Sequence, residues 1–401
     1  MRLRRPPAAR ALLVAALAGL AGAGAAGRGE GGDEPRGLQA PQLGQAGTQP
    51  AASERLGFPG FATKNTTRVG GADPIADAAA VARAVYPGSG PGQRPPAVVL
   101  VDADDWAAGI AAAVLMSSPL RAPILLADGR ELPPASAEAL EALAPTGADG
   151  LGGVQVIRIG DEVPAPAGLR STTISGDDPA ALAAAIDRYQ AAAAGRASRE
   201  VVVVSQDAPA YAMPAAGWAA KSGNPVLLVG RDTIPGATFA ALRGHARPRI
   251  YLLGPRAAIG DRVERALARL GDVTRIAGPD PVRNAIAFAR FTDGVFGWGV
   301  VDPGHGLVFA NAGRPADAAA AAPLSAAGTY GPLLLVDDAE ELPLPVGRYL
   351  LDIQPGYQRD PVRGVYNHGW LIGDEAALSL PVQSRIDSLL EISPVRVSQT
   401  P

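Results

Sequence analysis

The sequence contains no cysteine, and aromatic residues make up only 5% of its 401 residues. The lack of Cys excludes disulfides, Cys-ligated metal sites and lipid attachment through a Cys. With 47% hydrophobic residues, the core must be built from Ala, Val, Leu and Ile. Histidine is also scarce. The three His residues, at 245, 305 and 368, lie far apart without ligand spacing, which argues against a catalytic triad or a zinc site.

The sequence has no basic stripe: Lys occurs only at Lys64 and Lys221, and the formal net charge is −3. Removing the first 26 residues takes away four Arg residues and leaves a net charge of about −7. Nucleic-acid binding needs clustered Lys and Arg that neutralise phosphates. We therefore expect no nucleic-acid partner.

The N-terminus has the pattern of an export signal. A basic segment, Met1–Arg10, precedes an apolar run of about 16 residues, which is shorter than the roughly 20 that a spanning helix needs. Small residues such as Ala23 and Ala25 suit signal peptidase. We predict a signal peptide over 1–26, no stable membrane insertion after cleavage, and a secreted, cell-wall-located protein. The Gly-, Pro- and Gln-rich stretch 27–62 is predicted to be a flexible linker.

Most of the remaining chain is a threefold repeat with a period of about 105 residues. The stretch "PILLADGRELP" is echoed by "PVLLVGRDTIP" and "PLLLVDDAEELP". Each is preceded, in the same order, by a short strand ending in Gly and Asp-Pro, an Ala-rich helix, an apolar strand and a second Ala-rich helix. A period of this length suits one small domain per repeat. We place the repeats at 63–168, 169–271 and 272–401.

The strands are continuous Val, Ile and Leu runs, which indicate burial on both faces and therefore parallel sheets covered by helices. Strands that alternate with helices predict βαβ units, so each repeat is expected to be a doubly wound α/β domain. The Asp of each Asp-Pro pair suits a helix N-cap. The segment 393–401 resembles the strand that opens each repeat. One interpretation is that each opening strand joins the sheet of the repeat before it, and that the C-terminal copy completes the third sheet.

The repeats resemble the cell-wall-binding repeat 2 family of bacterial surface proteins over about residues 66–398. The third repeat carries "RIAGPDPVRNAIAFA" and "ANAGRPADAAAAAPLSAAGTYGPLLLVDDAEELP", the second "YLLGPRAAIGDRVERALARLG", and the first "RVGGADPIADAAAVA". The resemblance implies three flavodoxin-like (Rossmann-like) parallel-sheet repeats in a pseudo-threefold arrangement within a monomer. It also implies non-covalent binding of an anionic wall polymer or polysaccharide.

The sequence departs from the family pattern at two places. The family's Arg-Tyr pair after the Asp is replaced by Pro and an apolar residue in every repeat. A family Asp survives only as Asp317, while Ala108 and Tyr211 stand at the equivalent positions of the first two repeats. If the lost side chains carry polymer contacts, the scaffold is retained while the ligand differs.

Ligands of open α/β sheets bind at the carboxyl ends of the strands, and Arg pairs well with phosphate and carboxylate groups. We predict polymer contacts at Arg68, Asp73, Asp104, Asp178, Gln206, Arg275, Asp280, Asn311, Arg314 and Asp317. The alternative is that these residues are helix caps and solvated surface charges. The acidic run 102–105 supplies too few oxygens for a hard cation. No metal or cofactor is expected.

Two functions fit these features. The preferred one is a secreted, non-catalytic envelope protein that binds wall polymer through three repeats, whose weak sites reinforce one another. The alternative is an exported solute-binding protein or enzyme with a small polar ligand in a cleft between repeats. A hydrolase would need a nucleophile next to a base, and the scarcity of His argues against it.

Overall fold

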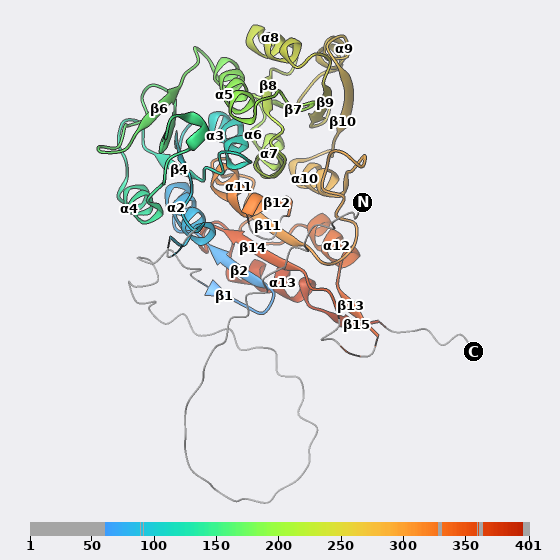
Figure 1. Cartoon of the computed structure of the whole chain (residues 1–401). Helices are drawn as coiled ribbons and strands as arrows, with labels where there is room; N and C mark the ends of the chain where they lie inside the picture. The colour runs from blue at the N-terminus through green and yellow to red at the C-terminus, as the bar shows by residue number, and fades with distance from the viewer. Residues whose placement is uncertain are drawn as a thin grey trace, which may run out of the picture. The chain divides into compact units, whose positions relative to one another are not determined.

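The computed structural model describes residues 61–88, 90, 92–327, 331–358, 360 and 364–395. The predicted signal peptide and most of the predicted linker lie outside these residues. The short strand β1 (Phe61–Ala62) falls at the end of the predicted linker. The described part contains three main sheets, parallel except for the antiparallel edge strand β1, and each is covered by helices, which confirms the predicted α/β fold (Figure 1).

The first unit is built on the sheet with strand order β4-β3-β5-β6. Its strands are β3 (Val98–Asp102), β4 (Ile124–Ala127), β5 (Val156–Ile159) and β6 (Ser171–Ile174). The helices that follow these strands are α3 (Trp106–Ala112), η1 (Ala113–Met116), α4 (Pro134–Leu143), η2 (Asp149–Leu151) and α5 (Pro179–Ala194).

The second unit has the strand order β10-β9-β7-β8. Its strands are β7 (Glu200–Ser205), β8 (Val226–Val229), β9 (Arg249–Leu253) and β10 (Asp272–Ile276). The helices that follow them are α6 (Pro209–Ala212), α7 (Pro214–Ser222), α8 (Gly236–Gly244), α9 (Asp261–Leu267) and α10 (Pro281–Arg290).

The third unit has the strand order β1-β2-β14-β11-β12. Its remaining strands are β2 (Thr66–Val69), β11 (Gly306–Asn311), β12 (Leu333–Val336) and β14 (His368–Ile372). Its helices are α2 (Pro74–Val85), α11 (Asp317–Ala327), α12 (Leu344–Asp352) and α13 (Leu380–Leu390). Strands β13 (Gly356–Tyr357) and β15 (Ser393–Pro394) form a separate two-stranded sheet.

The opening strand of each repeat joins the sheet of the repeat before it, as one interpretation of the sequence predicted. Strand β6 pairs with β5, and β10 pairs with β9, both in parallel. The third sheet is closed by β2 from the beginning of the chain, with Thr67 opposite Trp370 of β14. The prediction that the C-terminal copy completes this sheet was wrong. Strand β15 pairs with β13 instead, and its Pro394 has no N–H to donate to a sheet ladder.

The three units meet through helices α3, α7 and α11, which are made mainly of small residues. In α11, every residue from Asp317 to Ser325 is buried, and in α7 the same holds from Pro214 to Ala220. A helix that is buried all round belongs in the core. Small residues let these helices approach closely, since a Cβ at Gly109 of α3 would lie 3.0 Å from the Cβ of Ala319. Each unit therefore contributes one equivalent helix to a shared core, as a pseudo-threefold arrangement requires.

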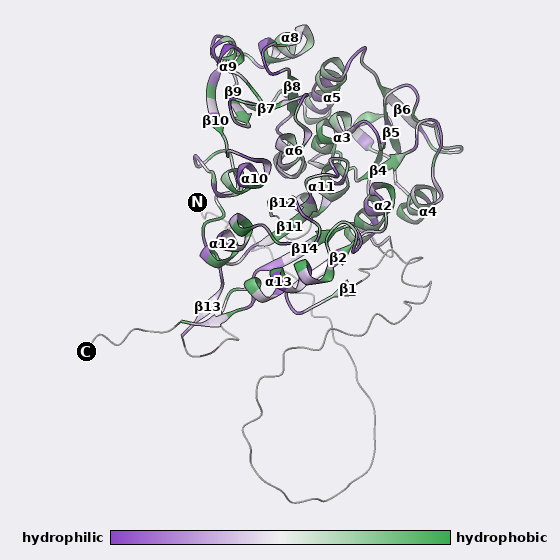
Figure 2. Ribbon diagram, turned by 180° about the vertical axis from the view of Figure 1, so that it is seen from behind, coloured by the Kyte–Doolittle hydropathy of each residue, from purple (hydrophilic) through white to green (hydrophobic). Residues whose placement is uncertain are grey.

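The outer helices are amphipathic, in contrast to the central ones. In α10 the buried positions include Val282, Ala285, Phe288 and Ala289, spaced by three or four residues as one helical face requires. Figure 2 shows both hydrophobic and hydrophilic colours on α10 and α12. Among the described residues, no helix combines the length and apolar character that crossing a bilayer needs.

The repeated prolines stand where the sequence placed them, directly before strands β4, β8 and β12. The carbonyl groups of Pro123, Pro225 and Pro332 each accept a hydrogen bond from the neighbouring strand, at 2.9, 2.9 and 3.0 Å. Proline keeps its carbonyl acceptor while lacking an N–H. The position directly before an edge strand is thus occupied by proline in all three units, where its missing N–H breaks no ladder bond.

Candidate functional site

A cleft of about 610 Å³ lies between the first and second units, at the carboxyl ends of β3 and β7. Its polar lining consists mainly of carboxylates, from Asp102, Asp104, Asp105, Asp178 and Asp207. Gln206 and Trp106 also line it, together with the apolar residues Ala107, Pro179 and Pro235. Three residues predicted as polymer contacts, Asp104, Asp178 and Gln206, are therefore brought together at the edge where open α/β sheets bind ligands.

Local capping interactions hold the first-unit side of the cleft. Asp102 Oδ1 accepts a hydrogen bond from the backbone N of Asp104 at 3.0 Å. Asp105 caps α3 by accepting from Ala108 N at 2.9 Å, and Asp178 caps α5 by accepting from Ala181 N at 2.7 Å. On this side of the cleft, Asp side chains therefore hold the backbone of the loop after β3 and of the first turn of α5.

The second-unit side is fixed by similar contacts and leaves the cleft strongly acidic. Asp207 Oδ2 accepts from Arg231 N at 3.0 Å, and Gln206 N donates to the Val229 carbonyl at 2.9 Å. Among the described residues, no Lys or Arg lines the cleft. The site therefore favours hydrogen-bond donors and cations and repels anionic groups.

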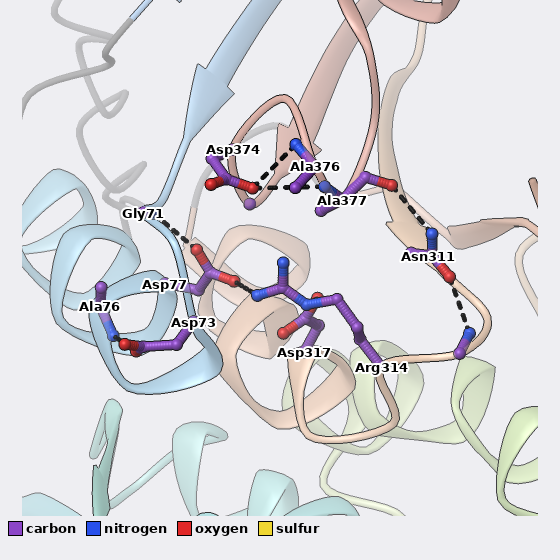
Figure 3. A network of polar contacts seen from close by, with 12 residues as sticks. Gly71, Asp73, Ala76, Asp77, Asn311, Arg314, Asp317, Asp374, Ala376 and Ala377 are labelled. Carbon is purple, nitrogen blue, oxygen red and sulfur yellow. Dashed lines mark hydrogen bonds and ion pairs between the residues drawn. The ribbon is translucent and has the colours of Figure 1, made fainter. Parts of the chain in front are cut away.

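The predicted contacts of the third unit lie in a buried network rather than in the cleft (Figure 3). Arg314 donates to Asp77 Oδ2 at 2.6 Å and forms an ion pair with Asp317 Oδ2 at 2.9 Å that lacks hydrogen-bond alignment. Both carboxylates are fully buried. Asn311 accepts from Gly313 N and donates to the Ala377 carbonyl, at 2.8 and 2.9 Å. The contact between Arg314 and Asp77 ties helix α2, from the first repeat of the sequence, to the loop before α11.

Burial and mutual repulsion shift the titration of this carboxylate pair. Burial raises the pKa of Asp77 to about 9, and the neighbouring charge of Asp317 adds to the increase. Burial also raises the pKa of Asp317 to about 6, although the Arg314 charge opposes that shift. Two carboxylates sharing one guanidinium group retain a proton at neutral pH because both cannot ionise cheaply there.

The other two units do not repeat this network, and this difference follows the departures noted in the sequence. In the first unit, Ala108 and Leu182 occupy the positions equivalent to Asp317 and Asp77. In the second unit, Asn284 replaces Asp77, and its Oδ1 accepts from Gly278 N at 3.1 Å, as Asp77 Oδ1 accepts from Gly71 N. The ion network is therefore specific to the third unit.

Arg68 and Arg275 occupy equivalent places in β2 and β10 and hold turns of the backbone. Arg68 is only 5% exposed and donates to the carbonyls of Gly373 and Leu378 at 2.9 and 2.6 Å. Arg275 donates to the Gly254 carbonyl at 2.8 Å and pairs with Glu264 at 2.9 Å. Because both guanidinium groups already make these contacts, we do not include Arg68 and Arg275 in the polymer contact proposed below.

Asp73 and Asp280 cap helices α2 and α10, as the Asp-Pro pattern predicted. Asp73 Oδ1 accepts from Ala76 N at 2.8 Å, and Asp280 Oδ1 accepts from Arg283 N at 2.7 Å. Neither lines the cleft. The described residues include no group of three or more His, Asp or Glu side chains placed to hold a metal ion.

Trp106 is the aromatic residue of the cleft, and like Asp102, Asp105 and Asp207 it is absent from the predicted contacts. It is partly exposed and starts α3, directly after the acidic loop. Its position just after a strand could have predicted this, because an aromatic residue at the ligand-binding edge of a sheet offers an apolar surface.

Three parallel α/β units around a shared core of small-residue helices define a three-unit repeat protein with an open cleft between its first two units. The family model of Cell wall binding domain 2 (CWB2) matches residues 173–264 and 275–383, which is half of the chain. The chain belongs to this family of cell-wall-binding domains, so the resemblance read from the repeats is confirmed.

Solved structures share the fold at low identity. Cwp6 from Clostridium difficile is 19% identical, with a TM-score of 0.66 over 82% of this chain and 48% of that chain. Cwp8 from Clostridium difficile is also 19% identical, with a TM-score of 0.61 over 82% of this chain and 52% of that chain. This chain thus spans about half the length of each. No curated protein matches the chain.

Proposed function

We propose that the protein is a secreted, non-catalytic envelope protein that binds cell-wall polymer without a covalent link. Membership of the CWB2 family over half of the chain is the observation that carries this proposal. The N-terminal sequence pattern supports export, and attachment would place the protein at the cell wall. A monomer is sufficient, because the three units already lie in one chain.

The cleft between the first two units is the proposed polymer contact. The Trp106 side chain can pack against the apolar face of a sugar ring. Sugar hydroxyl groups can donate hydrogen bonds to Asp104, Asp178 and Gln206. Because every charged side chain that lines the cleft is acidic, the polymer would meet it through hydroxyl-bearing, uncharged sugar units rather than through phosphate or carboxylate groups.

The placement of the histidines supports a non-catalytic role. His245 is buried against Asp187 and the Ser198 carbonyl. His368 Nε2 lies 3.0 Å from Thr67 Oγ1 between β14 and β2, where burial lowers the pKa of His368. His305 pairs with Asp302, and none of the three His residues lines the cleft. Hydrolysis by a nucleophile–base pair would require both groups to face the substrate.

A small-ligand protein or enzyme remains the second candidate, since the cleft lies between two repeats as that function requires. The deciding experiment is retention of the purified protein on bacterial wall material, before and after extraction of the polymer fraction. We expect retention that disappears on extraction, without release of soluble sugars. Retention that survives extraction would contradict the proposal, and sugar release would favour the enzyme.

The cleft itself is tested by Trp106→Ala. Loss of the stacking surface should reduce wall retention at least several-fold while leaving the unfolding midpoint nearly unchanged. The matched control is Tyr366→Ala, which removes another exposed aromatic side chain, 49% exposed, that precedes β14 and does not line the cleft. Equal retention of both variants would exclude the cleft as the contact.

A further inference from the structure

Three equivalent helix junctions connect the units, and they differ in chemistry. At each junction, the helix that opens a repeat packs on a helix of the preceding unit in the cycle: α5 on α3, α10 on α6, and α2 on α11. The first junction is apolar, because Leu182 and Ala108 occupy the equivalent positions and are both buried. The second is polar and uncharged, since Asn284 Nδ2 donates to the Tyr211 carbonyl at 3.4 Å. The third is therefore the one in which these positions carry ionisable groups.

The third junction joins residues that are far apart in the sequence. Arg314 pairs with Asp77 of α2 at 2.6 Å across 237 positions, and with Asp317 of α11 at 2.9 Å. Helix α2 also packs on α4 and β4 of the first unit. The contact at Asp77 therefore lies where the first and third units meet, and it closes the cycle of three units.

This network contains two carboxyl groups and one guanidinium group. Both carboxyl groups are fully buried, whereas the Arg314 side chain is 20% exposed. Neither oxygen of Asp317 has a hydrogen-bond partner among the described residues. With one carboxyl group protonated the network is neutral, but with both ionised it holds a net negative charge away from water, which is costly. The stability of the junction therefore depends on a bound proton.

The charged groups around the network do not compensate the second negative charge. Arg68 of β2 attracts Asp77, but it also interacts with Asp374 and Glu375 after β14. Asp73 at the start of α2 adds negative charge beside the network. Arg83 stands in the last turn of α2. The charged residues of the other elements packed against α2 and α11 are exposed: Glu138 and Glu141 of α4, and Lys221 of α7.

We propose that the junction of α2 with α11 is a proton-controlled joint, which stays closed while the Asp77–Asp317 pair keeps a proton and opens locally when the pair loses it. Opening exposes both carboxyl groups to water, where they ionise cheaply. In the closed joint the pKa of Asp77 is about 9 and that of Asp317 about 6, against about 4 for an exposed carboxyl group. The closed form therefore loses stability as the pH rises through 6 and 9.

The test is amide hydrogen exchange of the full chain at pH 5 and pH 9, corrected for the intrinsic exchange rate at each pH. From pH 5 to pH 9, protection in 66–69 and 74–85 should fall at least tenfold more than in 171–174 and 179–194, the equivalent segments of the first junction. Local opening predicts this difference, because global unfolding would expose all four segments together.

The matched variant is Asp77→Asn, which copies Asn284 of the second junction and keeps an acceptor for Gly71 N. With one carboxyl group left beside one guanidinium group, the extra loss of protection at pH 9 should shrink to less than threefold. Asp178→Asn, which changes an exposed carboxylate at the start of α5, is the control and should leave that loss unchanged. If Asp77→Asn does not fold, Asp317→Asn should give the same result.

Three results would overturn the inference: equal protection of 74–85 at the two pH values, an equal fall at all three junctions, or an extra fall that persists in full after removal of one carboxyl group. Neither Asp77 nor Asp317 lines the cleft proposed as the polymer contact. The exchange measurement uses no wall material, so its outcome is independent of the proposed function.

Discussion

Individual Asp residues in this protein have different roles according to their burial. Asp77 and Asp317 are fully buried and both contact the guanidinium group of Arg314. Asp104 and Asp178, by contrast, are exposed at the open cleft. Exposed carboxylates keep their charge cheaply in water, while buried ones are costly to ionise. The same residue type therefore contributes an acidic ligand surface in one place and a proton-retaining contact in another.

The buried pair predicts that the protein loses stability as the pH rises. The pKa of each carboxyl group is higher in the folded protein, at about 9 and about 6, than the value of about 4 in an unfolded chain. The folded state thus binds more protons, so this contribution is fully present below pH 4 and is lost as the pH rises through 6 and 9. The raised pKa of His245 acts in the same direction. Urea unfolding midpoints should fall between pH 5 and pH 9.

Asp317→Asn should flatten this pH dependence. A shift of about two pKa units corresponds to about 3 kcal/mol, so we expect the pH 5 to pH 9 difference to shrink by about 2 kcal/mol. Asp149→Asn, which changes an exposed carboxylate, is the control and should leave the slope unchanged. A wild-type midpoint that rises with pH would contradict the assignment.

The roles of single residues were predictable from the sequence where their partners are local. The caps at Asp73, Asp178 and Asp280 depend on residues three positions away. Arg68 was expected at a ligand site, yet its partners lie about 300 residues later in the chain. A pattern within one repeat contains no information about such distant partners, so the engagement of Arg68 required the structure.

At the scale of the element, Asp178 has two roles that substitution can separate. It caps α5 through Ala181 N, and it also lines the cleft. Asp178→Ala removes both, and the lost cap should lower the free energy of unfolding by about 1 kcal/mol. Asp178→Asn keeps a good cap, so its stability should stay within a few tenths of a kcal/mol of wild type.

Denaturant unfolding and wall retention, measured together, check this separation. If the carboxylate contacts polymer, Asp178→Asn should lower retention without lowering stability. Asp280→Ala, which removes an equivalent cap away from the cleft, should lower stability and leave retention unchanged. Retention that follows stability across the three variants would mean that Asp178 acts only as a cap.

The type of each element was predictable, but the membership of the third sheet was not. Apolar runs, Asp-Pro pairs and repeated prolines predicted the strands and helix starts correctly. Both ends of the chain carry a segment that resembles an opening strand, so the pattern alone could not decide which one pairs with β14. The structure assigns β2 to that place, with Arg68 reaching the turn after β14.

At the scale of the whole molecule, the three units are joined by helix packing, and the pairing of β2 with β14 brings the opening strand of the first repeat into the sheet of the third. Glycine permits the closest helix contacts, since a Cβ at Gly217 of α7 would lie 2.7 Å from Ser325 Oγ of α11. The resemblance predicted a pseudo-threefold arrangement, but the contact points depend on which small residues face each other. Such pairings follow from three-dimensional packing and not from the repeat pattern.

The closure by β2 can be tested with a matched pair of proline substitutions. Thr67 in β2 and Thr172 in β6 occupy equivalent positions, opposite Trp370 and Ile157. Proline removes an N–H from the strand. Thr67→Pro should increase amide hydrogen exchange in 368–372, and Thr172→Pro should do so in 156–159. If Thr67→Pro leaves the amides of 368–372 protected, or increases exchange equally in all three sheets, the pairing of β2 with β14 is wrong.

The pairing of β2 with β14 also determines when the molecule can be completed. A polypeptide that emerges N-terminus first can finish its first sheet once β6 has emerged, long before synthesis ends. Strand β2 emerges early and pairs locally with β1, but its pairing with β14 has to wait until the segment at 368–372 follows about 300 residues later. The sheet of the third unit therefore stays incomplete until its last strand, β14, has been made, although β2 was made early in synthesis.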